Sequence, residues 1–160
     1  MAALYTGMGD GGYTAVIGDG KISKADVLID LIGTMDEASA ALGLARACAD
    51  VGKIKTDIQW LLRIFVPLMG AVAGGKIAAD AELISELERK IDGYGTEFDG
   101  FSMPGENLVS AHLNMARCIV RRAERVAAAL LHEGRISRET AVCLNRMSDL
   151  IYAMSRCAEK

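Results

Sequence analysis

The segment Glu106–Glu133, ENLVSAHLNMARCIVRRAERVAAALLHE, carries the longest helical pattern of this 160-residue chain. Its apolar residues recur every three or four positions, which places them on one face of a helix. They are Leu113, Ala116, Val120, Ala123, Ala127 and Leu130. Gly134 follows directly and is a typical helix stop. We predict one long amphipathic helix here, with its apolar face against a core.

Apolar periodicity on both sides of this segment predicts four more helices, over about 24–52, 53–74, 80–93 and 137–157. Asp80 and Ser137 are suited to be N-caps, and Pro67 should kink the second helix because it lacks a backbone donor. Gly93–Gly105 reads as a loop, and no period-two alternation is sustained. We therefore expect an all-α five-helix bundle in one domain, residues 1–160, with a glycine-rich arm at 1–22 and the bundle at 23–160.

The composition narrows the class of protein. Hydrophobic residues make up 51% but aromatic residues only 5%, so the core must be built from Ala, Leu, Ile, Val and Met. A net charge of −3 argues against a nucleic-acid partner. The four cysteines contain no C-x-x-C pair, which favours buried free thiols in a reducing compartment. The start has no secretion-signal pattern, and the most apolar stretch, 64–75, is too short to span a membrane, so we expect a cytoplasmic protein.

The N-terminal arm is dense in glycine and cannot form a stable helix. Gly7, Gly9 and Gly12 match G-x-G-x-x-G, but no strand precedes the match and no helix follows at once, so a dinucleotide-binding unit is excluded. Tyr13 stands where a Walker A loop needs Lys. Two interpretations remain open: backbone amides that wrap an anion, or a flexible N-terminus without function.

The long helix carries a run of arginines. Arg117, Arg121 and Arg125 are spaced by four residues and share one face, and Glu124 is the only local acid among them. A solvated helix face is one explanation. A polyanion site, most simply for a triphosphate, is the other, because a guanidinium binds phosphate oxygens in bidentate geometry.

Other polar residues have weaker signals. Asp36 and Glu37 are either an ordinary exposed acidic pair, or Asp36 meets an arginine of another helix or subunit. His112 and His132 are too far apart for a local metal pair, and the Glu-x-x-His motifs of a di-iron bundle are absent.

Several blocks together resemble the PduO-type ATP:cob(I)alamin adenosyltransferases, the corrinoid adenosyltransferase family. Residues 5–14, YTGMGDGGYT, are similar to the family's ATP-binding arm, and 33–37, GTMDE, to its G-x-V-D-E segment. Residues 101–105, FSMPG, resemble its F-x-x-P-G-G turn. The most specific pair is ARCIVRRAER at 116–125 with NRMSD at 145–149.

The resemblance implies a homotrimer whose active sites lie between subunits and transfer the 5′-deoxyadenosyl group of ATP to Co(I) of a corrinoid, with Mg²⁺ assisting. Asp36, Phe101 and Arg121 are the implied catalytic residues, with Asp36 and Arg121 paired across the interface and Phe101 against the corrin ring. The implied ATP-binding residues are Thr6, Gly7, Gly9, Asp10, Gly12, Thr14, Lys24, Arg121, Glu124, Arg125 and Asn145.

The family context also implies two protein partners, a reductase and an adenosylcobalamin-dependent enzyme. Gly7, Gly11 and Tyr13 depart from the residues usual in the family's arm. These departures motivate a second hypothesis, a non-catalytic relative that binds a corrinoid or a nucleotide. A helical scaffold without any small ligand is a third, which the arginine run disfavours.

Overall fold

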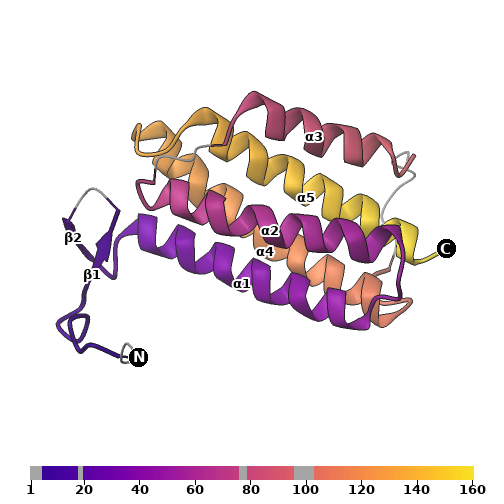
Figure 1. The fold of residues 1–160 in the computed structure, drawn as a ribbon, viewed down its shortest axis with the longest axis horizontal. Coiled ribbons are helices and arrows are strands. Elements are labelled where there is room, and N and C mark those ends of the chain that lie inside the picture. Colours follow the sequence, from indigo (N-terminus) through magenta and orange to yellow (C-terminus); the bar gives the residue numbers. More distant parts are fainter. Residues whose placement is uncertain (1–4, 18–19, 76–78, 96–102) are drawn as a thin grey trace.

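The computed structural model describes residues 5–17, 20–75, 79–95 and 103–160. Five helices form the bundle: α1 (Val27–Cys48), α2 (Lys53–Val72), α3 (Ala81–Asp92), α4 (Leu108–His132) and α5 (Arg138–Ala158). Helix α4 packs along α1 on one side and α5 on the other, and α3 lies on the outer side of α5 (Figure 1). The predicted helical bundle is confirmed.

Capping groups set the helix ends close to the predicted positions. The side chains of Asp80 and Ser137 accept hydrogen bonds from the first turns of α3 and α5, as expected. Helix α4 begins one residue after Asn107, which forms a reciprocal capping box with Ser110. Gly134, with a φ of +70°, follows its last turn in a conformation that favours glycine. The bounds of α4 are therefore decided locally.

The arm differs from the all-α expectation because it contains a short antiparallel hairpin. Strand β1 (Tyr13–Val16) pairs with β2 (Gly20–Ser23), with Tyr13 opposite Ser23 and Val16 opposite Gly20. Each strand has four residues, too few for alternation to be recognised in the sequence. The predicted glycine-rich segment thus consists of turns that lead into a two-stranded antiparallel hairpin.

The core is made of aliphatic side chains, as the composition required. The predicted stripe of α4 is fully buried, and Phe65 is the largest completely buried side chain. All four cysteines are free, but only Cys143 is buried, whereas Cys48 and Cys118 are exposed and Cys157 is partly exposed. The expectation of four buried thiols was therefore wrong, because helices pack tightly along one face only and the other face stays open. Across the described ranges, none of the helices is both long and apolar enough to cross a bilayer.

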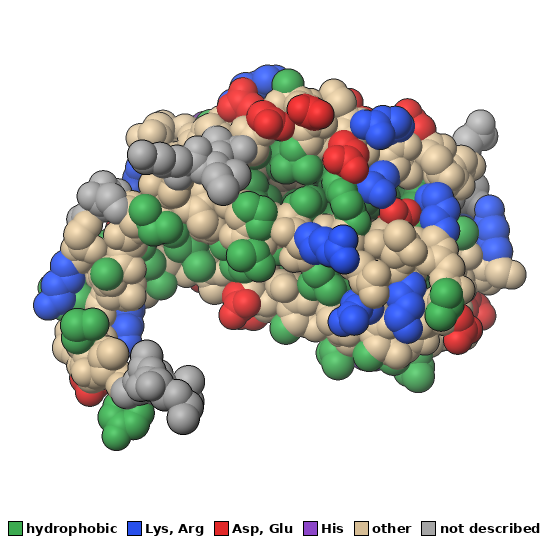
Figure 2. Space-filling model, viewed as in Figure 1, with side chains coloured by type: hydrophobic (Ala, Val, Ile, Leu, Met, Phe, Trp, Pro, Cys, Tyr) green, Lys and Arg blue, Asp and Glu red, His purple; other side chains and the backbone are tan. Residues whose placement is uncertain are grey.

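The arm projects from the bundle. It leaves the body where α1 begins and α4 ends (Figure 1), and the space-filling view shows it as a separate lobe with open space between its tip and the body (Figure 2).

Candidate active site

Three arginines in the middle of α4 have different surroundings. Arg122 forms an ion pair with Glu37 of α1. The Arg125 guanidinium donates to the backbone carbonyl of Arg121 at 3.1 Å. Arg121 and Arg125 are exposed, and neither forms an ion pair with any residue that the structure describes. Their two charges are left available for an anion.

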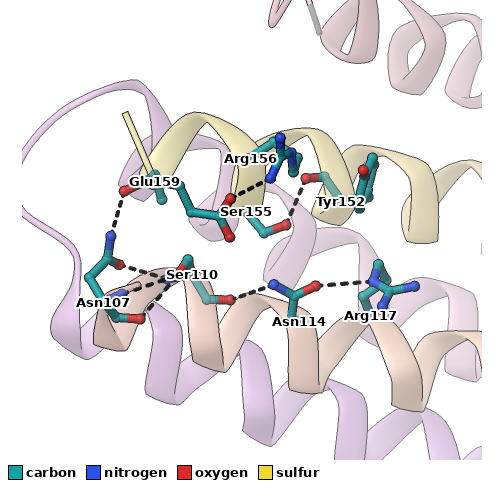
Figure 3. A network of polar contacts seen from close by, with 9 residues as sticks. Asn107, Ser110, Asn114, Arg117, Tyr152, Ser155, Arg156 and Glu159 are labelled. Atoms are coloured by element: carbon teal, nitrogen blue, oxygen red, sulfur yellow. Dashed lines mark hydrogen bonds and ion pairs between the residues drawn. The ribbon is translucent and has the colours of Figure 1, made fainter. Parts of the chain in front are cut away.

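Arg117, the third member of the predicted arginine face, is engaged elsewhere. Its Nε donates to the side-chain oxygen of Asn114 at 3.3 Å, and its guanidinium lies 5.8 Å from the ring centre of Tyr152 on α5. It belongs to a polar network that joins the first half of α4 to the end of α5, and Asn107 and Ser110 are also members (Figure 3). The structure therefore separates Arg117 from the candidate anion site.

A chain of hydrogen bonds runs beside the two exposed arginines. The amide nitrogen of Asn145 donates to Glu124 Oε1 at 2.8 Å, so α5 is joined to α4. Arg146 donates to the amide oxygen of Asn145 at 2.6 Å and to Glu88 Oε1 on α3 at 2.8 Å. Two predicted site residues, Glu124 and Asn145, are thus in direct contact.

Asp149 lies one turn further along α5 and borders the groove between α3 and α5, together with Glu88 and Arg146. Loss of solvent raises the pKa of its carboxyl group above the usual value. The guanidinium of Arg146 opposes that rise, and Glu124 adds to it. This corner of the bundle therefore holds several interacting charges.

The arm forms a second group of predicted site residues. Its glycines turn the chain back on itself, with hydrogen bonds from Asp10 N to Gly7 O at 3.2 Å and from Gly12 N to Gly9 O at 3.3 Å. Lys24 N donates to Gly12 O at 2.9 Å, and a Cβ at Gly9 would lie 3.0 Å from the Lys24 ammonium. Glycine at position 9 thus allows close approach of the backbone to a cation.

A depression of about 510 Å³ opens on the arm. Thr6, Gly9 and Thr14 line it, with Tyr13 and Lys21 on its rim, where the Lys21 ammonium lies 5.1 Å from the Tyr13 ring centre. Hydroxyls, a lysine and an aromatic face are groups that a nucleotide can use.

Two contacts lie where the arm meets the bundle. Asp26, the N-cap of α1, accepts hydrogen bonds from Leu28 N at 2.8 Å and from Arg135 in the α4–α5 turn at 2.6 Å, and these two bonds, the first above all, lower the pKa of its carboxyl group. Gly74, with a φ of +90°, comes so close to the hairpin that a Cβ there would lie 2.0 Å from Ile17 O. The direction of the arm is set at these positions.

The two groups of predicted residues stay apart within one chain. No hydrogen bond or ion pair joins residues 5–17 of the arm to α4 in the described part of the chain. Asp36 is exposed on α1 and has no ion-pair partner there, and the acid that meets an arginine is its neighbour Glu37. Phe101 lies outside the described residues. The predicted pairing of Asp36 with Arg121 of a neighbouring subunit is not tested by a single chain and stays a prediction.

Sequence reasoning did not select every residue near the site. Arg146 was visible only as part of NRMSD, and Glu88, Arg135 and Gly74 carried no local signal because each meets a residue far away in the sequence. As for metals, no three acidic, histidine or cysteine side chains in the described ranges are grouped closely enough to hold an ion.

Fold and site together define a five-helix bundle with exposed arginines beside the Glu124–Asn145 contact of α4 and α5, and with a projecting arm that contains several glycines. The chain belongs to the cobalamin adenosyltransferase family, whose sequence model matches residues 4–158. A corrinoid adenosyltransferase of Bacillus subtilis is 34% identical over 96% of this chain and 84% of its own length. One from Mycobacterium tuberculosis is 31% identical over 99% of this chain and 89% of its own length.

Solved structures agree with the sequence comparison. A variant PduO-type ATP:corrinoid adenosyltransferase from Lactobacillus reuteri, complexed with cobalamin and ATP, has a TM-score of 0.89 and 25% identity, and the match covers 98% of this chain and 91% of that one. Another variant from the same organism, complexed with ATP, has a TM-score of 0.86 and 26% identity over 98% and 94% of the two chains.

Proposed function

We propose that this chain transfers the 5′-deoxyadenosyl group of ATP to the cobalt of a corrinoid. Co(I) attacks the ribose 5′ carbon, the carbon–oxygen bond to the triphosphate breaks, and the cobalt–carbon bond forms as Co(I) becomes formally Co(III). The observation that carries the proposal is the pair of exposed guanidiniums, Arg121 and Arg125, beside the Glu124–Asn145 contact in a member of this family. They are positioned to neutralise the charge that gathers on the departing triphosphate.

The arm supplies the other half of the ATP site. We assign the phosphates to the amides around Gly7, Gly9 and Gly12 and to the Lys24 ammonium, with the hydroxyls of Thr6 and Thr14 nearby. Mg²⁺ usually binds through one or two carboxylates together with substrate phosphates and water, so a cage of protein ligands is not required. The exposed carboxylate of Asp10 is a suitable ligand, and the ion would shield the phosphate charge when ATP is bound.

The active form is a homotrimer in which the arm of one copy meets α4 of the next. Helix α1 has apolar residues on two faces. One face lies in the core, and the other carries three exposed apolar residues in line with Asp36, which are Ala40, Leu44 and Ala47. On α4, Met115 and Cys118 are likewise exposed, about two turns and one turn before Arg121. Contact between these surfaces in neighbouring copies would bury both apolar stripes and allow Asp36 to pair with Arg121.

The corrinoid lies in the same intersubunit site, with Phe101 against its lower face. An apolar side chain there excludes water and the lower axial ligand from cobalt, which makes the Co(I) state easier to reach. A cytoplasmic reductase would supply the electron, and an adenosylcobalamin-dependent enzyme would receive the product. No nucleic-acid or membrane partner is needed.

The deciding experiment is an adenosylation assay with purified protein, Mg-ATP, cob(II)alamin and a strong chemical reductant. Formation of the cobalt–carbon bond appears as the corrinoid absorption change, and free triphosphate accumulates in equal amount. Tight binding of ATP and corrinoid without that change would instead favour the non-catalytic relative. Absence of thermal stabilisation by either substrate would favour a scaffold without a small ligand, because a ligand that binds only the native state must raise its stability.

A further inference from the structure

Three hydrogen bonds connect α3, α5 and α4 in a single line. Arg146 on α5 donates through Nε to Glu88 on α3 at 2.8 Å and through a terminal nitrogen to Asn145 Oδ1 at 2.6 Å. Asn145 donates through Nδ2 to Glu124 Oε1 on α4 at 2.8 Å. The line starts in the groove between α3 and α5 and ends at the carboxylate beside the exposed arginines.

The donor and acceptor groups of these side chains determine which way the Asn145 amide faces. An asparagine amide has an acceptor oxygen and a donor nitrogen of nearly equal shape, so a half-turn of the group exchanges them at little steric cost. A guanidinium can only donate, so Arg146 holds the amide oxygen of Asn145 on its own side. The nitrogen must then face Glu124, whose carboxylate can only accept.

Glu88 is the anchor of this arrangement. A guanidinium presents its donors in a rigid planar fork, so a bond from Nε to Glu88 also fixes the direction of the terminal nitrogen that reaches Asn145. The side chains of Glu88 and Arg146 are 46% and 35% exposed, and ion pairs at this exposure contribute little to stability. Their main effect is therefore on orientation.

We propose that Glu88 and Arg146 are positioning residues for the ATP site, which act by holding the Asn145 amide in the orientation that contacts Glu124. The inference rests on the proposed function, since it assigns Asn145 and Glu124 to ATP. Neither positioning residue touches the substrate. Both set the geometry of the residues that do.

Arg146→Lys is the first test. A lysine ammonium is a point charge on a flexible stem and cannot hold two acceptors in the geometry of the fork. We expect KM for ATP to rise about tenfold, as for the loss of one hydrogen bond to a charged group. The KM for the corrinoid should hardly change. Arg138→Lys, an exposed arginine in the first turn of α5, is the matched control and should match the wild type.

A double-mutant cycle distinguishes two roles of Arg146: orienting the Asn145 amide, or only holding the helices together. In an Asn145→Ala background the amide is already gone, so Arg146→Lys should raise KM no further, although each substitution alone raises it. Equal rises in both backgrounds would overturn the proposal. Glu88→Gln keeps an acceptor oxygen and should stay close to the wild type, whereas Glu88→Ala should resemble Arg146→Lys. If Arg146→Lys does not fold, the comparison of Glu88→Gln with Glu88→Ala tests the proposal in its place.

A measurement without turnover completes the test. The side-chain amide protons of Asn145 should exchange slowly with solvent in the apoprotein and become fast in Glu88→Ala but not in Glu88→Gln. Fast exchange in the wild type would overturn the proposal. If the proposed function is wrong, the wild type does not adenosylate the corrinoid, while these exchange rates still report the line of bonds. If only the inference is wrong, the wild type is active and Arg146→Lys behaves as Arg138→Lys does.

Discussion

Arg122 of α4 is paired with Glu37 of α1 in the same chain, in the interface that packs these two helices together. The pair is at the surface, with side chains 48% and 61% exposed, so it adds little to stability. Its presence shows that consecutive arginines on α4 face different surroundings. Arg122 is paired within the chain, whereas Arg121 forms no ion pair with any residue that the structure describes and only opposes, through its charge, the rise in the pKa of Asp149.

Arg121→Ala should lower kcat/KM for adenosylation by about a hundredfold or more, the order expected when a charge facing a phosphate or a buried partner is lost. Arg122→Ala should stay within about fivefold of the wild type, because it removes only an exposed ion pair. Steady-state kinetics with both substrates varied will measure this difference. Similar losses in the two variants would mean that the arginine run is a structural or solvated face.

Leu44→Glu should reduce the proposed trimer to monomers without unfolding the bundle. Leu44 is 56% exposed on the outer face of α1, so a charge there is harmless in the monomer but costly inside an interface. Val66→Glu, on the exposed side of α2, is the control. Light scattering gives the mass and circular dichroism the helix content. A wild type that is a fully active monomer would contradict the shared-site proposal.

Gly74→Ala should weaken Mg-ATP binding by displacing the arm. A methyl group there would meet the Ile17 carbonyl, and its positive φ is unfavourable for alanine. Gly70→Ala, one turn earlier in α2, has open space around the new Cβ and should raise stability by about 0.5–1 kcal/mol. Calorimetric titration with Mg-ATP compares the two. Unchanged affinity in Gly74→Ala would show that the hairpin contact does not direct the arm.

Asp57→Asn should make the chain less sensitive to acid. Burial alone would raise the pKa of Asp57, but hydrogen bonds from Lys90 and Tyr94, both at 2.7 Å, outweigh it and the pKa is lowered. The stabilisation is therefore complete above the unfolded value of about 4 and is lost as pH falls through the lower folded value. We expect the variant to lose about 2 kcal/mol of unfolding free energy at pH 7, the size of a hydrogen bond to a charged group, and much less near pH 2.

Urea unfolding at one fixed protein concentration, at both pH values, measures this change. Asp26 also has a lowered pKa and is retained in the variant, so part of the acid sensitivity should remain. An equal loss of unfolding free energy at both pH values would indicate that the ionised form of Asp57 is not what stabilises the α2–α3 contact.

Phe101→Ala should sharply reduce turnover with cob(II)alamin and reductant but leave the Mg-ATP dissociation constant nearly unchanged. The reason is the family resemblance of the FSMPG turn, which assigns Phe101 to the lower face of cobalt. Electron paramagnetic resonance of bound cob(II)alamin should show less four-coordinate cobalt in the variant. Met103→Ala, an exposed neighbour, is the control. Normal turnover by a folded Phe101→Ala protein would refute the assignment.

The local chemistry of the sequence was sufficient for the helices. Apolar periodicity located all five, and Asp80, Ser137 and Gly134 marked their ends because capping involves only residues within one turn. The hairpin of the arm was missed because two strands of four residues depend on pairing with each other rather than on their own pattern.

Within the candidate site, the motifs in the sequence determined which residue types were present: the arginines of α4, Glu124, Asn145 and the glycines of the arm. Only the tertiary structure decided which of them act together. It paired Arg122 with Glu37, set Arg117 beside the Tyr152 ring, joined Asn145 directly to Glu124 and, through Arg146, to Glu88, and aimed the arm away from its own bundle (Figure 1). These pairings depend on the distance between side chains on different helices. That distance follows from how the helices pack, a property of the whole core that no local segment contains.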